Sequence, residues 1–176
     1  MNEPYILGLD TSTTCTGVCK LAIGSDNLEY TKFSTPKKLV KKIPVNTFIE
    51  RLDNQLKMFW SFIQPDLSCL VLCSIETLTH ARNLGIVKKL GAVQYGYQYE
   101  LYKKTGYHFL EVKPTEHKAC LGKGNMGKKD TVLAVNEKFK LSLTLKDNDI
   151  ADAISVANYV KTHSNTLKTS LINRRY

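Results

Sequence analysis

The chain has 176 residues, of which 43% are hydrophobic and 23% charged, which fits one globular domain with an ordinary core and excludes a disordered chain. Its net charge of +9 and pI near 9.3 suit a polyanionic partner, with nucleic acid first and an anionic membrane surface second. No apolar run approaches the length of a membrane span, and the N-terminus lacks a signal-peptide pattern, so we expect a cytoplasmic protein without a membrane partner.

Three strands are predicted at the start of the chain. Residues 5–10 form an apolar run that ends on Asp10, and residues 17–23 and 28–34 read as two further strands separated by turn residues. Tight turns between successive strands predict an antiparallel meander. The basic stretch 36–42 is interpreted as a solvated loop.

A helix is expected over residues 46–64, because large apolar side chains recur there at helical spacing and Pro65 ends the pattern. The predicted apolar face consists of Phe48, Leu52, Leu56, Phe59, Trp60 and Ile63. The predicted polar face consists of Glu50, Arg51, Asp53 and Lys57. Residues 69–75 then form a continuous apolar run that ends at Glu76, as expected for a central strand covered on both faces.

A long helix is predicted from about Arg82 to Lys104. Its apolar stripe comprises Ile86, Leu90, Val93, Tyr97 and Leu101. Gly85, Gly91 and Gly96 interrupt it, each at a cost of roughly 1 kcal/mol in helix propensity. Close packing of this helix, either in a dimer or in a groove within one subunit, would offset that cost.

The C-terminal third begins with a fifth strand at 107–112, followed by a short helix that starts at Lys113-Pro114. The glycine- and lysine-rich segment 121–130 predicts a mobile loop, and helices follow at about 128–139 and 148–163. Residues 164–176 are polar and basic with no apolar period, so we expect a disordered tail after a domain at 1–163.

This order of elements predicts an α/β fold with one mixed sheet of five strands, in which an antiparallel meander is joined by parallel strands and flanked by helices. An RNase H-like fold has this organisation, although the order of elements alone does not single it out. The C-x3-C pairs Cys15/Cys19 and Cys69/Cys73 lie in or beside strand-like runs, where cysteine acts as a small hydrophobe, so we expect neither zinc nor a disulfide framework.

Four carboxylates carry the chemistry that the sequence suggests. Asp10 and Glu76 stand at the ends of two predicted strands, and side chains at the ends of adjacent parallel strands emerge at one edge of a sheet. Asp149 and Asp152 stand three residues apart on the last helix, so they share one face and flank its apolar stripe. That stripe comprises Ile150, Ala153, Ile154, Ala157 and Val160.

Gathering these acids requires compensation, since a like-charge pair near 4 Å costs about 4 kcal/mol at an effective dielectric of 20. Magnesium prefers oxygen ligands, and two ions roughly 4 Å apart can activate a water and stabilise the leaving oxygen in phosphodiester hydrolysis. The rest of the chain then carries +13, a field suited to a nucleic-acid backbone.

Each acid also has a simpler explanation. Asp10 could cap the turn that follows it, Glu76 could pair with Arg82 or Lys113, and Asp149 and Asp152 could be surface residues at a helix start. Taken together, the order of strand-end Asp, strand-end Glu and helical DxxD favours the metal site.

Four segments resemble, in order, those of RuvC-like Holliday-junction resolvases. They are ILGLDTSTTCTGVCKL, VLCSIETLTHARN, VKPTEHKACLGKGNMGKKDTVLAVN and DNDIADAISVAN, within residues 5–163. The resemblance, to a compact bacteriophage-encoded member, implies that Asp10, Glu76, Asp149 and Asp152 bind two magnesium or manganese ions. It further implies a homodimer that nicks two opposing strands of a four-way DNA junction symmetrically, without a small-molecule cofactor.

The resemblance also implies phosphate contacts near the cut for Lys113 and Lys129, with Lys128 a near-equal candidate for the second place. DNA contacts are further expected from His80, Arg82, Asn83 and Lys123. Where some members carry a stacking aromatic residue after the catalytic Glu, this chain has Thr79, which leaves its engagement of the junction open.

Two other classes of function are considered. The LDTST opening also resembles the phosphate loop of actin-like ATPases and tRNA-modification proteins, a reading that leaves Glu76 and the DxxD helix unexplained. A junction-binding protein that does not cut would be expected to have lost one of the four acids, and all four are present. Within the nuclease class, RNase H activity or flap cutting is discriminated poorly by sequence.

Overall fold

The central feature of the computed structural model is a five-stranded mixed sheet, and the model describes residues 1–35, 39–40, 43–44, 47–78 and 83–164. The strand order is β3-β2-β1-β6-β7. The strands are β1 (Tyr5–Thr11), β2 (Cys15–Ala22), β3 (Leu28–Ser34), β6 (Leu70–Glu76) and β7 (Phe109–Val112). β1 to β3 form an antiparallel meander, while β6 is parallel to both β1 and β7. The predicted mixed sheet is therefore confirmed.

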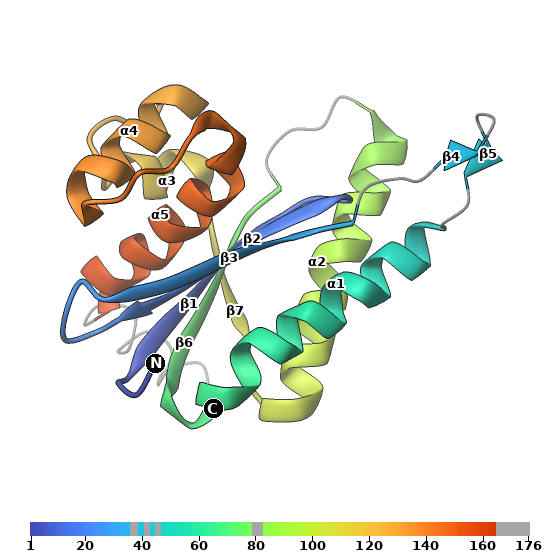
Figure 1. The fold of residues 1–176 in the computed structure, drawn as a ribbon, viewed down its shortest axis with the longest axis horizontal. Helices are drawn as coiled ribbons and strands as arrows, with labels where there is room; N and C mark the ends of the chain where they lie inside the picture. Colours follow the sequence, from blue (N-terminus) through green and yellow to red (C-terminus); the bar gives the residue numbers. More distant parts are fainter. Residues whose placement is uncertain (36–38, 41–42, 45–46, 79–82, 165–176) are drawn as a thin grey trace.

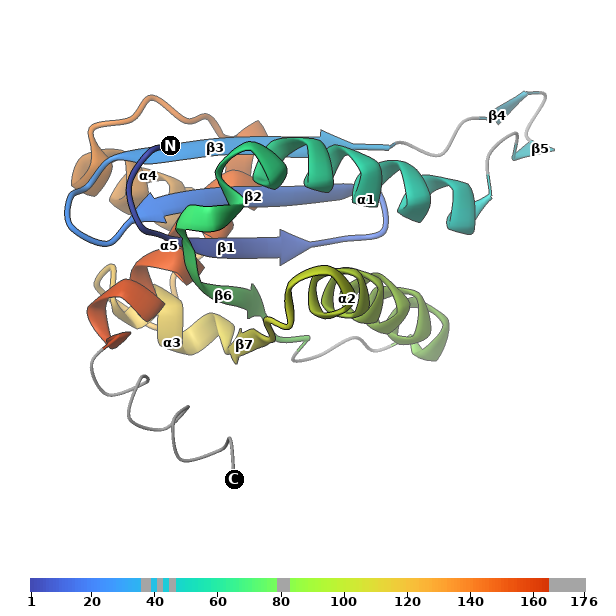
Figure 2. The same cartoon turned by 90° about the horizontal axis from the view of Figure 1, so that it is seen from below.

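Helices cover both faces of this sheet (Figures 1 and 2). α1 (Phe48–Ile63) and α2 (Leu84–Thr105) lie on one face. α5 (Asn148–Thr162) lies on the other face, with α3 (Pro114–Ala119) and α4 (Lys128–Phe139) packed outside it. Successive side chains of a strand point to opposite faces of the sheet, so the strands contribute to two separate apolar clusters. In β1, Tyr5, Leu7 and Leu9 point toward α1 and α2, and Ile6 points toward α5.

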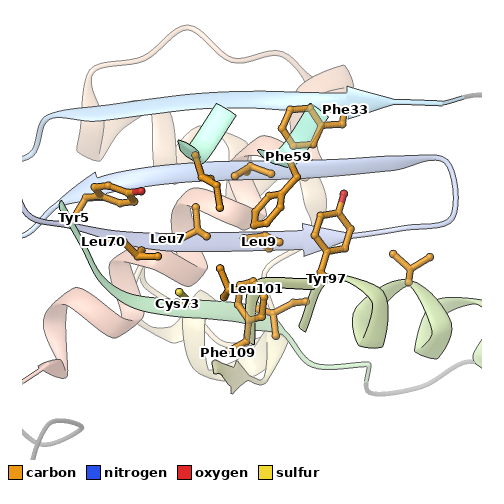
Figure 3. Close-up of a cluster of buried hydrophobic side chains, with 14 residues drawn as sticks. Tyr5, Leu7, Leu9, Phe33, Phe59, Leu70, Cys73, Tyr97, Leu101 and Phe109 are labelled. Carbon is orange, nitrogen blue, oxygen red and sulfur yellow. The ribbon is translucent and has the colours of Figure 1, made fainter. Parts of the chain in front are cut away.

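Large side chains fill the core between the sheet and α1 and α2 (Figure 3). Phe59 of α1 meets Tyr97 of α2 edge to face, with ring centroids 5.1 Å apart. α1 begins with a capping box, in which Thr47 Oγ1 accepts from the backbone N–H of Glu50 and the Glu50 carboxylate accepts from Thr47. The expectation that Arg51 lies on the exposed face is wrong, because it is buried with its guanidinium donating to the Thr47 carbonyl.

Only the C-terminal half of α2 packs on the sheet. Val93, Tyr97 and Leu101 are buried as predicted, whereas Ile86 is exposed, so the predicted stripe does not continue to the start of the helix. The helix begins after its N-cap Asn83, and its first two turns extend beyond the end of β6 as one wall of a pocket. None of the described helices is long and apolar enough to cross a bilayer.

α5 is more deeply buried than an amphipathic stripe predicts. Its apolar stripe is buried as expected, and so are Ala151, Ser155 and Asn158, because α3 and α4 cover the side that faces away from the sheet. The Leu145–Asp147 3₁₀ turn leads into this helix, and another 3₁₀ segment, Gln64–Cys69, connects α1 to β6.

The basic stretch after β3 differs from the predicted solvated loop. It contains two short strands, β4 (Leu39–Val40) and β5 (Ile43–Pro44), which pair in antiparallel fashion. The predicted tail after Ser164 lies outside the described residues.

Candidate active site

Asp10 and Glu76 emerge side by side at one edge of the sheet. β1 and β6 are parallel, and their register pairs Leu9 with Ile75, so the two acids occupy the next positions along neighbouring strands. This confirms the expectation that both acids leave the sheet at the same edge. Alternation along β1 places Asp10 on the same face as Ile6 and Gly8, which is the face covered by α5.

Two strand glycines bring α5 against this edge. A Cβ added to Gly17, which pairs with Asp10, would lie 2.0 Å from the Asp149 carbonyl oxygen. A Cβ on Gly8 would lie 2.3 Å from the Ala153 carbonyl oxygen. No real Cβ tolerates either distance, so the helix backbone rests directly on the strands. This contact places Asp149 and Asp152 over the strand ends.

The four predicted carboxylates line one pocket of about 620 Å³. Two lysines, Lys118 and Lys128, belong to the same lining. Its apolar side comes from Leu78 and from Val87 and Leu90 in the first turns of α2. The remaining lining residues are Thr11, Ser12, Thr77, Gln94 and Asn148.

The acids in this pocket are poorly compensated. Burial raises the pKa of Asp10 well above its ordinary value, and the charges of Glu76, Asp152 and Asp149 raise it further, against a small lowering by Lys128. The pKa of Asp152 is also raised, first by burial and then by Glu76, while Lys118 opposes the shift. Lys118 Nζ lies 3.9 Å from Asp152 Oδ1, a distance that is too long for a hydrogen bond.

The simpler explanations of Asp10 and Asp152, and the pairing of Glu76 with Lys113, do not match the structure, while Arg82, the other suggested partner of Glu76, lies outside the described residues. The turn after β1 is capped by the Ser12 hydroxyl, which accepts from the backbone N–H of Thr14 at 3.3 Å and of Cys15 at 2.9 Å. Lys113, a suggested partner of Glu76, lies near Glu116 instead, at 3.9 Å. Asp152 is 8% exposed and therefore is not a surface residue.

A divalent cation fits this donor set. Asp152 Oδ1 is buried and has no hydrogen-bond partner among the residues that the structure describes. Its unsatisfied oxygen, together with the mutual repulsion of the carboxylates, is what a hard cation would relieve. A carboxylate oxygen each from Glu76 and Asp152 and a ring nitrogen of His117 lie within 4.8 Å of one another.

Sequence reasoning missed three residues that act on Glu76 or Asp152. His117 is buried, and its Nε2 lies 2.8 Å from Glu76 Oε2. The Gln94 amide donates to the Glu76 backbone carbonyl at 2.6 Å, and Lys118 lies beside Asp152. The position of α3 in the chain could have indicated His117 and Lys118. This helix begins two residues after β7, and Val112 at the end of β7 pairs with Glu76.

The residues predicted to contact nucleic acid are spread more widely. Lys128 lines the pocket, whereas Lys113, Lys123 and Lys129 are exposed and do not belong to its lining. The Asn83 side chain caps α2 by accepting from the backbone N–H groups of Gly85 and Ile86. His80 and Arg82 lie outside the described residues.

The cysteines nearest the site behave as buried or protonated groups. Burial, with a smaller contribution from its hydrogen bond to Asp149, raises the pKa of Cys15 to about 12, so the thiol is a donor rather than a thiolate ligand. Cys19 is buried in the apolar cluster against α5, and Cys73 in the cluster against α1 and α2.

Comparison with known proteins identifies the fold. No protein-family model matches the sequence, and no curated protein sequence matches it. RuvC from T. thermophilus in complex with a Holliday junction substrate superposes with a TM-score of 0.74 at 15% identity, over 93% of this chain and 96% of that one. Another Thermus thermophilus RuvC structure gives a TM-score of 0.64 at 18% identity, over 92% of this chain and 96% of that one. The fold is the RNase H-like fold of RuvC.

Proposed function

We propose that this protein is a divalent-metal-dependent endonuclease that resolves four-way DNA junctions by paired symmetric nicks. The observation that carries the proposal is the gathering of Asp10, Glu76, Asp149 and Asp152 in one pocket of a RuvC-type fold. Those four acids are the cation ligands, with magnesium or manganese as the cation. Bound cations would supply Lewis-acid activation of water and charge neutralisation at the leaving oxygen.

The protein's own residues bind and orient the scissile phosphate. Lys118 and Lys128 are the cationic side chains among the described residues of the pocket lining, so they are placed to balance the charge of a phosphate brought against the carboxylates. Lys113, Lys123 and Lys129 lie outside the pocket and are proposed to contact the DNA backbone farther from the cut. With the four acids set aside the chain carries +13, which favours such contacts.

Part of the pocket lining is apolar. Leu78, Val87 and Leu90 are suited to a sugar or a base rather than to a phosphate. The Gln94 amide holds the end of β6 through the Glu76 carbonyl, which ties this apolar wall of α2 to the acidic strand end.

Neutral amide substitutions test the chemistry directly. Asp10→Asn, Glu76→Gln and Asp152→Asn each remove a carboxylate while keeping its size, so we expect cleavage of a labelled four-way junction in magnesium to fall at least about 100-fold. Binding of the junction in a gel-shift assay should persist, since each change removes a negative charge from a DNA-binding surface. Asp53→Asn, an exposed acid on α1, is the matched control.

The positions of the cuts test whether the protein resolves four-way junctions. Paired nicks at symmetric positions on opposing strands support resolution, and cuts confined to one arm or to an RNA strand contradict it. Substantial cleavage by any of the three amide variants would refute the assignment of the acids.

The outer face of α2 supports the proposed homodimer. Leu84, Gly91, Tyr95 and Tyr102 share one stripe at helical spacing, opposite the buried stripe. Tyr95 is 77% and Leu84 68% exposed, and a Cβ on Gly91 would meet no described atom within 4 Å. A Cβ added to Gly96, in contrast, would lie 3.3 Å from Leu52 of α1, so this glycine serves packing within the subunit. An apolar stripe with a small residue at its centre suits a second copy of the helix.

Tyr95→Glu should therefore convert a dimer to a monomer, because a carboxylate would be buried at the centre of the interface. Sedimentation equilibrium measures the mass, and the junction assay should show uncoupled single nicks. Ile49→Glu, which alters an apolar residue that is 67% exposed on α1, should leave the mass unchanged. A monomeric wild-type protein at micromolar concentration would contradict this arrangement.

A further inference from the structure

The buried imidazole of His117 makes contacts on both of its nitrogens. Nε2 lies 2.8 Å from Glu76 Oε2, and Nδ1 lies 2.8 Å from the hydroxyl oxygen of Ser155 on α5. The side chain is 0% exposed, so neither nitrogen can exchange its partner for bulk water. Ser155 and Glu76 are therefore the groups that hold the ring in place.

The Ser155 hydroxyl has two partners for its single proton. Ser155 Oγ lies 2.8 Å from His117 Nδ1 and 3.1 Å from the His117 backbone carbonyl oxygen. When the hydroxyl donates to the carbonyl, Oγ accepts from the Nδ1 N–H, and the lone pair of the neutral imidazole is on Nε2. That lone pair then faces Glu76 Oε2 at 2.8 Å, an arrangement that a cation bound by both atoms would stabilise.

The unsatisfied carboxylate oxygen of Asp152 also points to a cation. Asp152 Oδ1 has no hydrogen-bond partner in the described part of the chain, and the residue is 8% exposed. Its carboxylate, Glu76 and His117 each offer an atom within 4.8 Å of the other two. A histidine that donates its remote N–H to a fixed acceptor while presenting the other nitrogen is the usual arrangement of a metal-binding imidazole.

We propose that His117 Nε2 is a direct ligand of one divalent ion, together with Glu76 and Asp152, and that this position therefore selects Mn²⁺ over Mg²⁺. Imidazole nitrogen suits transition metals, whereas Mg²⁺ is best served by oxygen alone. Ser155 is a positioning residue that holds the imidazole in the metal-binding tautomer. The inference rests on the proposed metal-dependent function and adds to it the identity of the preferred cation.

Pulsed EPR of the Mn²⁺-loaded full chain tests this assignment without reference to activity. We expect a directly bound ¹⁴N coupling in the wild type, which changes to a ¹⁵N coupling when histidine is ¹⁵N-labelled. His117→Gln should lose the coupling and reduce Mn²⁺ affinity by about 10-fold to 100-fold, with little change in Mg²⁺ affinity. Ser155→Ala should weaken Mn²⁺ binding less, because the nitrogen ligand remains.

His108→Gln is the matched control, since the His108 ring lies tilted against Tyr102 with ring centroids 4.6 Å apart and does not belong to the pocket lining. Its spectrum and Mn²⁺ affinity should equal those of the wild type. The wild-type spectrum alone decides the point if His117→Gln fails to fold.

Three outcomes separate this inference from the proposed function. Bound Mn²⁺ without a histidine nitrogen coupling overturns the His117 assignment, even if junctions are cut. A histidine coupling in a protein that cuts no junction supports the assignment and refutes the proposed nuclease. Failure to bind Mn²⁺ at millimolar concentration overturns both.

Discussion

Two groups of carboxylates lie on opposite faces of the sheet, and their pKa values are shifted in opposite directions. On the α5 face, the pKa values of Asp10 and Asp152 are raised by burial and by neighbouring acids. On the α1 face, the pKa of Asp66 is lowered, first by its hydrogen bond with Lys20 and then by the N-terminal amine. Lys20 is 2% exposed, and its Nζ lies 2.6 Å from Asp66 Oδ2 and 3.3 Å from Glu29 Oε2.

The contrast distinguishes acids that are paired within the fold from the acids of the proposed metal site. The group around Lys20 brings its own cations, so its charges are compensated within the fold. The acids around Asp10 are held together by backbone contacts in spite of the repulsion between their carboxylates. Two lysines lie nearby, but no described residue donates a hydrogen bond to Asp152 Oδ1. Such a site is less stable than it could be, as expected where function requires an external cation.

Removing one acid from each group should change stability in opposite directions. Asp66→Asn leaves the buried Lys20 ammonium with Glu29 alone, so the free energy of unfolding should fall by up to about 3 kcal/mol. Asp10→Asn relieves repulsion and should raise it by about 1 kcal/mol in the absence of metal. Urea unfolding in a chelator measures both, and destabilisation by Asp10→Asn would contradict the comparison.

The acidic group depends on the close approach of α5, which Gly17→Ala should disturb. Because the new Cβ would collide with the Asp149 carbonyl, the start of the helix must move outward. We expect a loss of about 1–3 kcal/mol in the free energy of unfolding. Junction cleavage should fall by more than the fraction of unfolded protein explains, because Asp149 moves with the helix.

Gly24→Ala provides the control for that change. Gly24 lies in the turn after β2, and no described atom would lie within 4 Å of its added Cβ. Both the unfolding curve and the cleavage rate should remain close to those of the wild type. Equal effects of the two substitutions would show that the approach of α5 is not what positions the acids.

Local patterns predicted the mixed sheet and the gathering of the four acids, whose role as metal ligands stays a prediction. Asp10 and Glu76 could be placed because the carboxyl ends of adjacent parallel strands share an edge, and Asp149 and Asp152 because residues three apart share a helix face. The glycines against which α5 packs could have been recognised from the sequence, since glycine inside a strand often marks a close backbone approach. That signal was missed for Gly8 and Gly17.

Other features depend on how elements dock and so could not be read from spacing. His117 reaches Glu76 only because α3 packs beside the end of β6, and the choice of Lys128 over Lys129 for the pocket depends on the rotation of α4. Likewise, the apolar period of α2 is continuous, but the sheet ends before Ile86, so one half of the stripe is buried and the other is not.

Lowering the pH should have a smaller effect that also distinguishes the two groups of carboxylates. The folded-state pKa of Asp66 is below its ordinary value of 3.8, so its contribution is complete above that value and is lost as the pH falls toward the folded-state pKa. Wild-type protein should therefore lose stability between about pH 5 and pH 3 more steeply than Asp66→Asn. The acidic group around Asp10 is common to both proteins, so its own pH dependence cancels in the difference between their unfolding free energies. Parallel acid profiles would mean that Lys20 and Asp66 do not form a stabilising pair, and the contrast between the two faces would then rest on the Asp10 group alone.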